Sequence, residues 1–79
     1  MRIHVTKKDI GLGITNDTTC CPVARALKRR FDTNLVSVGD SRATIRRKGY
    51  PLPESASQFV RDFDARKRVR PFSFTLKTK

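Results

Sequence analysis

The stretch CPVARALKRRFD, residues 21–32, decides much of the fold because its apolar side chains recur at helical spacing. This spacing places them on one face of an α-helix, while the arginines and lysines between them face away. Proline is tolerated in the first turn of a helix, and a preceding threonine is able to cap it. We therefore predict a helix over about residues 21–32 that buries the stripe Val23, Ala24, Leu27 and Phe31.

Short strands are predicted on both sides of this helix. Residues 1–6 alternate between apolar and polar side chains, as a half-buried strand does. Residues 35–38 and 42–46 have strand character, and the turn residues 39–41 between them indicate a hairpin. The sequence therefore predicts a strand before the helix and two paired strands after it.

The second half of the chain continues this pattern. A turn signal at Lys48–Gly49 precedes a third short strand over residues 50–52, which Pro51 restricts to the edge of a sheet. Apolar residues at helical spacing predict a second helix over residues 53–65. Residues 72–76 alternate again, with aromatic side chains on one side, which predicts a closing strand.

The segment before the first helix is less regular. Thr6 and Asp9 have the spacing of a helix-capping box, with aspartate in place of the usual glutamate or glutamine. One short helical turn that ends at Gly11 and Gly13 fits residues 6–13, and a loop fits them almost as well. Two glycines without a third, and without a helix directly after them, are a weak signal for a phosphate-binding loop.

The elements follow one another in the order β-α-β-β-α-β, and 79 residues are enough for one compact domain, residues 1–79. We predict an α+β fold with a small antiparallel or mixed sheet and two helices on one face, because this arrangement buries all apolar stripes at once. All five phenylalanines are expected to share one core. The predicted core consists of Ile3, Val5, Val23, Leu27, Phe31, Val36, Val38, Ala43, Ile45, Phe59, Val60, Phe63, Phe72 and Phe74.

Charge is the strongest compositional signal. Eighteen lysines and arginines against seven aspartates and glutamates leave a net charge of +11, which attracts nucleic acid first, then anionic membranes and acidic protein surfaces. Solvation alone explains many single charge runs, but here the cations form three groups. These lie on the first helix (Arg25, Lys28, Arg29, Arg30), on the hairpin (Arg42, Arg46, Arg47, Lys48) and on the connector after the second helix (Arg66, Lys67, Arg68, Arg70).

The residues of an enzyme site are scarce. The only histidine, His4, lies on a predicted strand, and Asp62 and Asp64 point to different sides of a helix. The adjacent Cys20 and Cys21 are poorly placed for a disulfide, and with one histidine they make an improbable zinc site. We therefore predict a protein that is not an enzyme, holds no metal or cofactor, and has two free thiols, at least one of them buried at the start of a helix.

Several motifs together resemble a family of small orphan proteins from phages and prophages. These are CPVARAL at 21–27, VSVG at 36–39, YPLP at 50–53, FVRDFD at 59–64 and PFSF at 71–74. The resemblance covers nearly the whole chain, and its motifs are mostly structural. Because that family has no settled function, the resemblance implies a phage-type protein but assigns no functional residues. The strongly basic connector and the second cysteine before Cys-Pro depart from the family's usual pattern.

Two functions from different classes fit these observations. The first is nucleic-acid binding through the phosphate-directed clusters, in the cytoplasm and without a membrane partner, since no apolar stretch approaches a membrane span. The alternative is a protein-interaction factor that binds an acidic surface of a host protein. A continuous stripe of cations favours the polyanion, whereas separate islands around an apolar patch favour the protein; the oligomeric state stays open.

The sheet face expected to be open also bears on the choice between base and phosphate contacts. It is basic and rich in hydroxyl groups, but it lacks the aromatic platform on which unpaired bases stack. If nucleic acid binds, phosphate contacts are therefore expected to dominate and sequence readout to be poor. The residues predicted on this face are Arg2, His4, Arg42, Thr44, Arg46, Ser73, Thr75 and Lys77.

Overall fold

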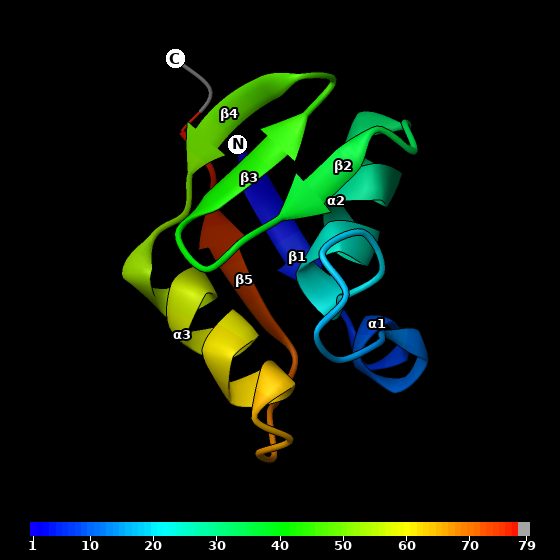
Figure 1. The fold of residues 1–79 in the computed structure, drawn as a ribbon, viewed down its shortest axis with the longest axis vertical. Coiled ribbons are helices and arrows are strands. Elements are labelled where there is room, and N and C mark those ends of the chain that lie inside the picture. Colours follow the sequence, from blue (N-terminus) through cyan, green and yellow to red (C-terminus); the bar gives the residue numbers. More distant parts are fainter. Residues whose placement is uncertain (78–79) are drawn as a thin grey trace.

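A computed structural model describes residues 1–77 of the protein, which form five strands and three helices (Figure 1). The helix predicted over residues 21–32 is present, as are the strands and the second helix. The third helix is the short turn that the capping box at Thr6 indicated. In chain order the elements are β1 (Arg2–Val5), α1 (Lys7–Leu12), α2 (Pro22–Phe31), β2 (Val36–Val38), β3 (Arg42–Ile45), β4 (Lys48–Pro51), α3 (Glu54–Asp64) and β5 (Phe72–Thr75).

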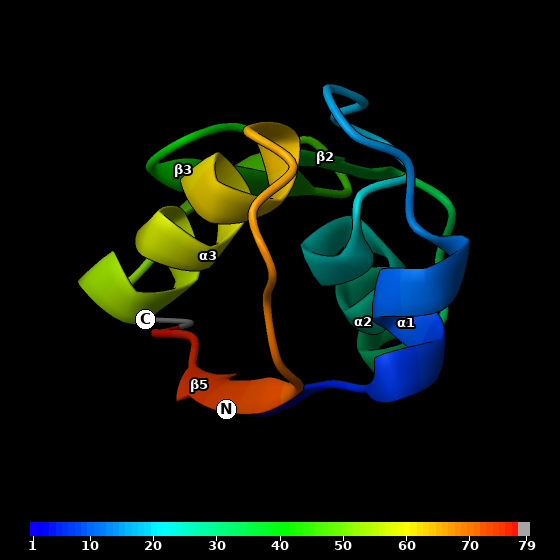
Figure 2. The same cartoon turned by 90° about the horizontal axis from the view of Figure 1, so that it is seen from below.

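The strands belong to two antiparallel sheets. β1 pairs with β5, with Ile3 opposite Phe74, and β2, β3 and β4 form a meander in that order. Figure 2 shows the sheets on opposite sides of the molecule, with α2 and α3 between them. The α+β class with antiparallel pairing is therefore confirmed. Among residues 1–77, β4 pairs with β3 alone, as the edge position predicted from Pro51 requires.

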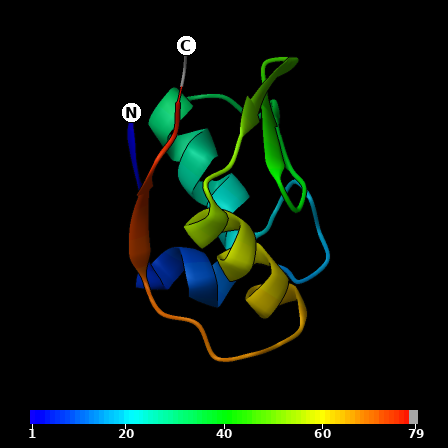
Figure 3. The same cartoon turned by 90° about the vertical axis from the view of Figure 1, so that its left-hand side faces the viewer.

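The predicted single sheet with both helices on one face is wrong in its arrangement. α2 contacts both β1 and β2, and α3 leads from β4 back toward β5, so each helix bridges the two sheets (Figures 2 and 3). The helices therefore occupy the space that an extra strand pairing would need. As a result, the predicted open face does not exist as one surface. Arg2, His4, Ser73 and Thr75 lie on the β1–β5 sheet, whereas Arg42 and Thr44 lie on the meander.

The core lies between the sheets and consists mostly of the predicted side chains. Phe31, Phe63 and Phe72 are only half-buried at its margin, while Leu52 and Leu76 are buried although the predicted core omitted them. Four of the five phenylalanines are linked, since the ring of Phe59 lies 4.6 Å from that of Phe72 and 6.3 Å from that of Phe63, and the rings of Phe72 and Phe74 are 5.6 Å apart. Phe31 packs against the core at the end of α2, outside these ring pairs.

The turn between β3 and β4 differs from the predicted one. The two turn residues are Arg46 and Arg47, both left-handed with φ of 50° and 71°, rather than Lys48–Gly49. This position leaves four residues, Lys48 to Pro51, to pair along the whole of β3. A two-residue hairpin turn with positive φ at both positions is of type I′, which normally uses asparagine, aspartate or glycine there.

None of the helices formed by residues 1–77 is long and apolar enough to cross a membrane. The longest is α3, with 11 residues.

The aromatic cluster yields a stability test. Phe59 is 8% exposed and has ring partners on both sides, so Phe59→Ala is expected to lower the free energy of unfolding by about 3–5 kcal/mol. Phe63→Ala is expected to cost clearly less, because the Phe63 ring is already half-exposed at the margin of the core. Urea denaturation of both variants measures the difference, and equal losses would contradict the packing described.

Candidate functional site

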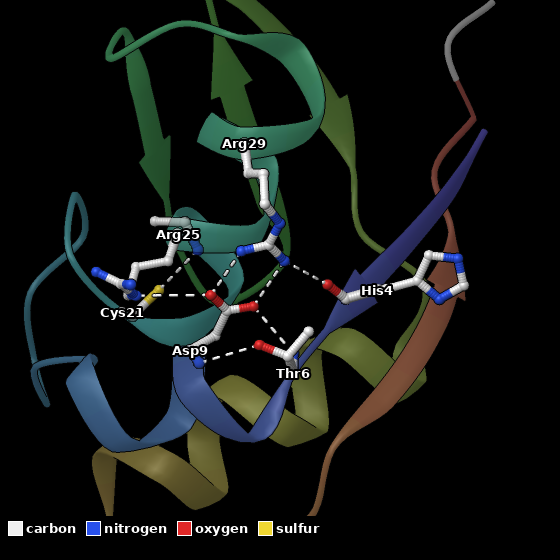
Figure 4. A network of polar contacts seen from close by, with 7 residues as sticks. His4, Thr6, Asp9, Cys21, Arg25 and Arg29 are labelled. Atoms are coloured by element: carbon white, nitrogen blue, oxygen red, sulfur yellow. Dashed lines mark hydrogen bonds and ion pairs between the residues drawn. The ribbon is translucent and has the colours of Figure 1, made fainter.

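A buried carboxylate organises the side of the molecule where α1 meets α2 (Figure 4). Asp9 is fully buried at the third position of α1, and its Oδ2 accepts a hydrogen bond from the backbone N–H of Thr6 at 2.9 Å. In return, Thr6 Oγ1 accepts from the backbone N–H of Asp9 at 3.2 Å. The capping box predicted from the sequence is thus complete, with aspartate in the role of glutamate.

Arg29 of α2 holds the other side of this carboxylate. Its Nη1 donates to Asp9 Oδ1 and its Nη2 to Asp9 Oδ2, both at 2.8 Å, and Nη2 also donates to the carbonyl of His4 at 3.0 Å. Bidentate pairs of this kind are among the stronger polar contacts in proteins. One arginine therefore ties α2 to both α1 and β1.

These contacts set the charge state of the pair. Burial by itself raises the pKa of the Asp9 carboxyl, but the hydrogen bonds from Arg29 and Thr6 and the charge of Arg29 outweigh it, so the pKa lies below its ordinary value. The Asp9 carboxylate likewise raises the pKa of Arg29. Arg29 was predicted as a nucleic-acid contact, but its guanidinium is engaged by Asp9 and the His4 carbonyl within the fold.

The other cations of α2 are less engaged by contacts within the fold than Arg29 is. The Nε of Arg25 lies 3.6 Å from Asp9 Oδ1, yet no hydrogen bond within residues 1–77 uses the Arg25 side chain, which is one-third exposed. Lys28 is half-buried and forms no ion pair with the described residues. Arg30 lines a small hollow together with His4, Ala26 and Arg29, and it does not line the groove described below. The predicted helix cluster is therefore divided.

A groove of about 750 Å³ lies between α1 and α2. Leu12 and Ile14 line it and are 55% and 52% exposed. Its other lining residues are Lys8, Cys20, Arg25, Lys28, Arg29 and Asn34. It combines an apolar part with several cations, and the sequence reasoning missed it because Lys8 and Leu12 belong to a segment that was also compatible with a loop.

The hairpin turn lies beside the far end of α2. Arg46 Nη2 donates to the carbonyl of Phe31 at 2.8 Å, and the Arg46 backbone N–H donates to the carbonyl of Leu35. Arg47 and Lys48 are exposed, and Lys48 Nζ lies 5.8 Å from the centre of the Tyr50 ring. Arg42, predicted to belong to this cluster, lies at the opposite end of β3.

The connector lies at the other end of the molecule, below α3 in Figure 1. Arg66 is left-handed, with φ of 62°, and the backbone N–H of Lys67 closes the end of α3 by donating to the carbonyl of Asp62. A hollow of about 430 Å³ beside Arg66, Lys67 and Arg68 is also lined by Ile10 of α1. Arg70 is exposed farther along the connector.

α1 is therefore the ridge that links the predicted clusters. One side of it faces the groove shared with α2, the other side faces the hollow shared with the connector, and the exposed Lys7 and Lys8 lie on it. Arg46 also attaches the hairpin turn, which carries Arg47 and Lys48, to the C-terminal end of α2. We call this surface the basic band and define it as Lys7, Lys8, Arg25, Lys28, Arg47, Lys48, Arg66, Lys67 and Arg68.

Three of the seven acidic residues lie on α3. Glu54, Asp62 and Asp64 belong to α3, where Glu54 pairs with Arg61 at 2.8 Å. Asp62 Oδ1 lies 3.9 Å from Lys67 Nζ, the one ion pair within residues 1–77 that involves the band and a residue of α3.

The two cysteines occupy different environments. Cys21 is buried as the N-cap of α2, where its Sγ accepts from the N–H of Ala24 at 3.4 Å, and burial raises the pKa of its thiol. The cap is therefore this cysteine and not the threonine we predicted, because Thr19 bonds to Asp17 instead. Cys20 is half-buried in the groove, and both thiols are free. Residues 1–77 contain no group of three His, Cys, Asp or Glu side chains placed to hold a metal ion.

Comparison with known proteins adds no assignment. The chain matches no protein-family model, and no curated protein or solved structure is significantly similar to it.

The buried carboxylate predicts a pH dependence of stability. Since the folded-state pKa of Asp9 lies below the unfolded value, its stabilisation is present above about pH 4 and is lost as the pH falls through the folded-state pKa. Asp9→Asn is expected to lower the free energy of unfolding at pH 7 by about 2–4 kcal/mol and to flatten the acid limb. Thermal denaturation across pH 2–7 measures both effects.

A matched variant separates this effect from a general change in charge. Asp40→Asn removes an exposed carboxylate that forms no ion pair among residues 1–77, and it is expected to keep most of the wild-type stability at pH 7. Equal losses for Asp9→Asn and Asp40→Asn would contradict a structural role of the buried pair.

Proposed function

We propose that the protein binds nucleic acid through phosphate contacts along the basic band. The observation that carries this proposal is the adjacency of the clusters, because α1 lines one hollow with cations of α2 and another with cations of the connector, and Arg46 attaches the hairpin turn to the end of α2. A continuous stripe of cations is the arrangement expected for a polyanion partner.

The dimensions support an extended partner. The hairpin turn and the connector lie at opposite ends of the longest axis of the molecule, which measures 31 Å (Figures 1 and 3). At about 3.4 Å per nucleotide along one strand, this length corresponds to about nine nucleotides of duplex. The band is thus long enough to meet several successive phosphates.

Backbone strain also supports a role for the cations at both ends. Within residues 1–77, five residues other than glycine have positive φ, and three of them are Arg46, Arg47 and Arg66. A left-handed conformation costs about 1–2 kcal/mol for a residue with a Cβ, and glycine avoids this cost. Arginine at these positions reduces stability, and a requirement for positive charge there accounts for its presence.

The geometry favours phosphate contacts over base readout. α2 is an unsuitable recognition helix, because one face is buried between the sheets and Arg29 is held by Asp9. Two half-buried rings lie beside the band. Tyr50 has its ring centre 5.8 Å from Lys48 Nζ, and Phe63 lines the hollow beside Arg66, Lys67 and Arg68, but neither ring is exposed as a base-stacking platform would be. Sequence preference is therefore expected to be weak and salt dependence strong.

The salt dependence provides the first test. If six to ten phosphates are neutralised, affinity for a short duplex is expected to fall roughly 10³–10⁵-fold between about 50 and 200 mM salt. Fluorescence anisotropy with duplex and single-stranded DNA and RNA of unrelated sequences measures it. Absence of binding at about 50 mM salt would contradict the proposal.

Charge reversal locates the contacts. Replacing Arg66, Lys67, Arg68 and Arg70 with glutamate is expected to weaken binding to all sequences alike and to reduce the salt slope by about 0.9 for each duplex phosphate lost. Arg61→Glu is the matched control, because Arg61 lies on α3 in an ion pair with Glu54, away from the basic band. If the control weakens binding as much per charge, net charge and not the band explains the affinity.

The strained arginines allow stability and binding to be separated. Arg47→Gly is expected to raise the free energy of unfolding by about 0.5–1 kcal/mol, because the relief of strain exceeds the added entropy of the unfolded chain. The same change is expected to weaken nucleic-acid binding several-fold. Arg68→Gly removes an equal charge from a residue outside the left-handed set, so it is expected to weaken binding without added stability. Urea denaturation and anisotropy give the two readouts.

A further inference from the structure

The groove between α1 and α2 has an apolar floor that phosphate binding does not use. Two of the four exposed large hydrophobic residues, Leu12 and Ile14, lie in it. Single exposed apolar residues are common on protein surfaces, whereas apolar residues gathered in a groove with polar edges are typical of protein-binding sites. The floor is therefore a feature that the proposed function leaves unexplained.

The local backbone holds this floor in place. A Cβ at Gly13 would lie 2.7 Å from the Pro22 ring, so only glycine allows the chain to pass this close to the start of α2. The Gly13 N–H donates to the carbonyl of Asp9, and the Ile14 N–H donates to the carbonyl of Cys20, both at 2.9 Å. The residues on either side of Gly13 are thus fixed with their side chains exposed, and the groove is formed before any partner arrives.

The edges of the groove are positively charged. Lys8 and Lys28 line it and form no ion pair with the described residues, and Arg25 lines it with its Nε 3.6 Å from Asp9 Oδ1 and no side-chain hydrogen bond among them. Among the residues described, none that lines the groove is acidic. The nearby Asp9 is fully buried. Guanidinium and ammonium groups around an apolar floor complement a segment that carries both carboxylates and apolar side chains.

We propose that this groove binds an acidic protein segment that places aliphatic side chains on Leu12 and Ile14 and carboxylates against Lys8, Arg25 and Lys28. An aliphatic floor without an aromatic ring fits such side chains better than nucleic-acid bases, which stack on aromatic rings. The volume of about 750 Å³ lies within the range of ligand-binding clefts. Since the three cations also belong to the basic band, the test changes the floor and leaves the charge unaltered.

The probe is a fluorescein-labelled synthetic peptide of about ten residues, built from glutamate with leucine at helical spacing. Replacing its leucines by serine gives a peptide of equal charge, which is expected to bind at least about tenfold more weakly. The double variant Leu12→Ser, Ile14→Ser is expected to weaken binding of the leucine peptide by a similar factor. Leu35→Ser is the matched control, because Leu35 is 62% exposed but does not line the groove, and it is expected to leave binding unchanged.

Anisotropy with short duplex DNA on the same variants separates this proposal from the proposed function. The double variant is expected to bind DNA within about twofold of wild type, whether or not the wild type binds DNA tightly, because its charge is unaltered. Equal binding of the leucine and serine peptides would overturn the groove proposal. The absence of saturable binding for both peptides would overturn it as well. Loss of DNA binding in the double variant with the peptide unaffected would overturn it as well and assign the groove to nucleic acid.

Discussion

The contact between Asp9 and Arg29 fixes α1 against α2 and β1 on the basic side of the molecule. α1 has six residues, too few for a helix that is stable on its own. It is held by its N-terminal cap and by Arg29, which also donates a hydrogen bond to the His4 carbonyl on β1. The paired carboxylate therefore helps to hold both the ridge beside the cationic clusters and one wall of the groove in place.

The same contact separates charge that shapes the fold from charge that is available to a partner. Removing a carboxylate from water is unfavourable, and a well-packed apolar pair often stabilises a protein as well as a buried ion pair does. An ion pair of fixed geometry, however, allows α1 only one position against α2 and β1. Counting cations in the sequence overstates the binding surface, because Arg29 is held by Asp9 and Arg46 by the Phe31 carbonyl.

The sequence predicted the parts that depend on local periodicity and missed those that depend on distant partners. Alternation and helical spacing located the strands and both longer helices, and Thr6 with Asp9 indicated the cap of the third. The division into two sheets was not predictable, because β1 pairs with β5 at the other end of the chain. Nor does any local signal show that Asp9 is buried or that Lys8 lies in a groove with Arg25, since charged residues normally indicate solvent exposure.

The use of glycine in this chain connects stability with the proposed function. None of its four glycines has positive φ, and Gly13 and Gly49 instead allow close approach to Pro22 and to Arg42. Arginines occupy the left-handed positions at the hairpin turn and after α3, where glycine would relieve backbone strain. A domain of this size has a small free energy of unfolding, so this strain is a substantial part of it. A tight turn and a closed helix end are rigid points of the backbone. A cation carried there loses less conformational freedom on binding than one on a mobile loop, so the strain that lowers stability also fixes the two ends of the basic band in advance.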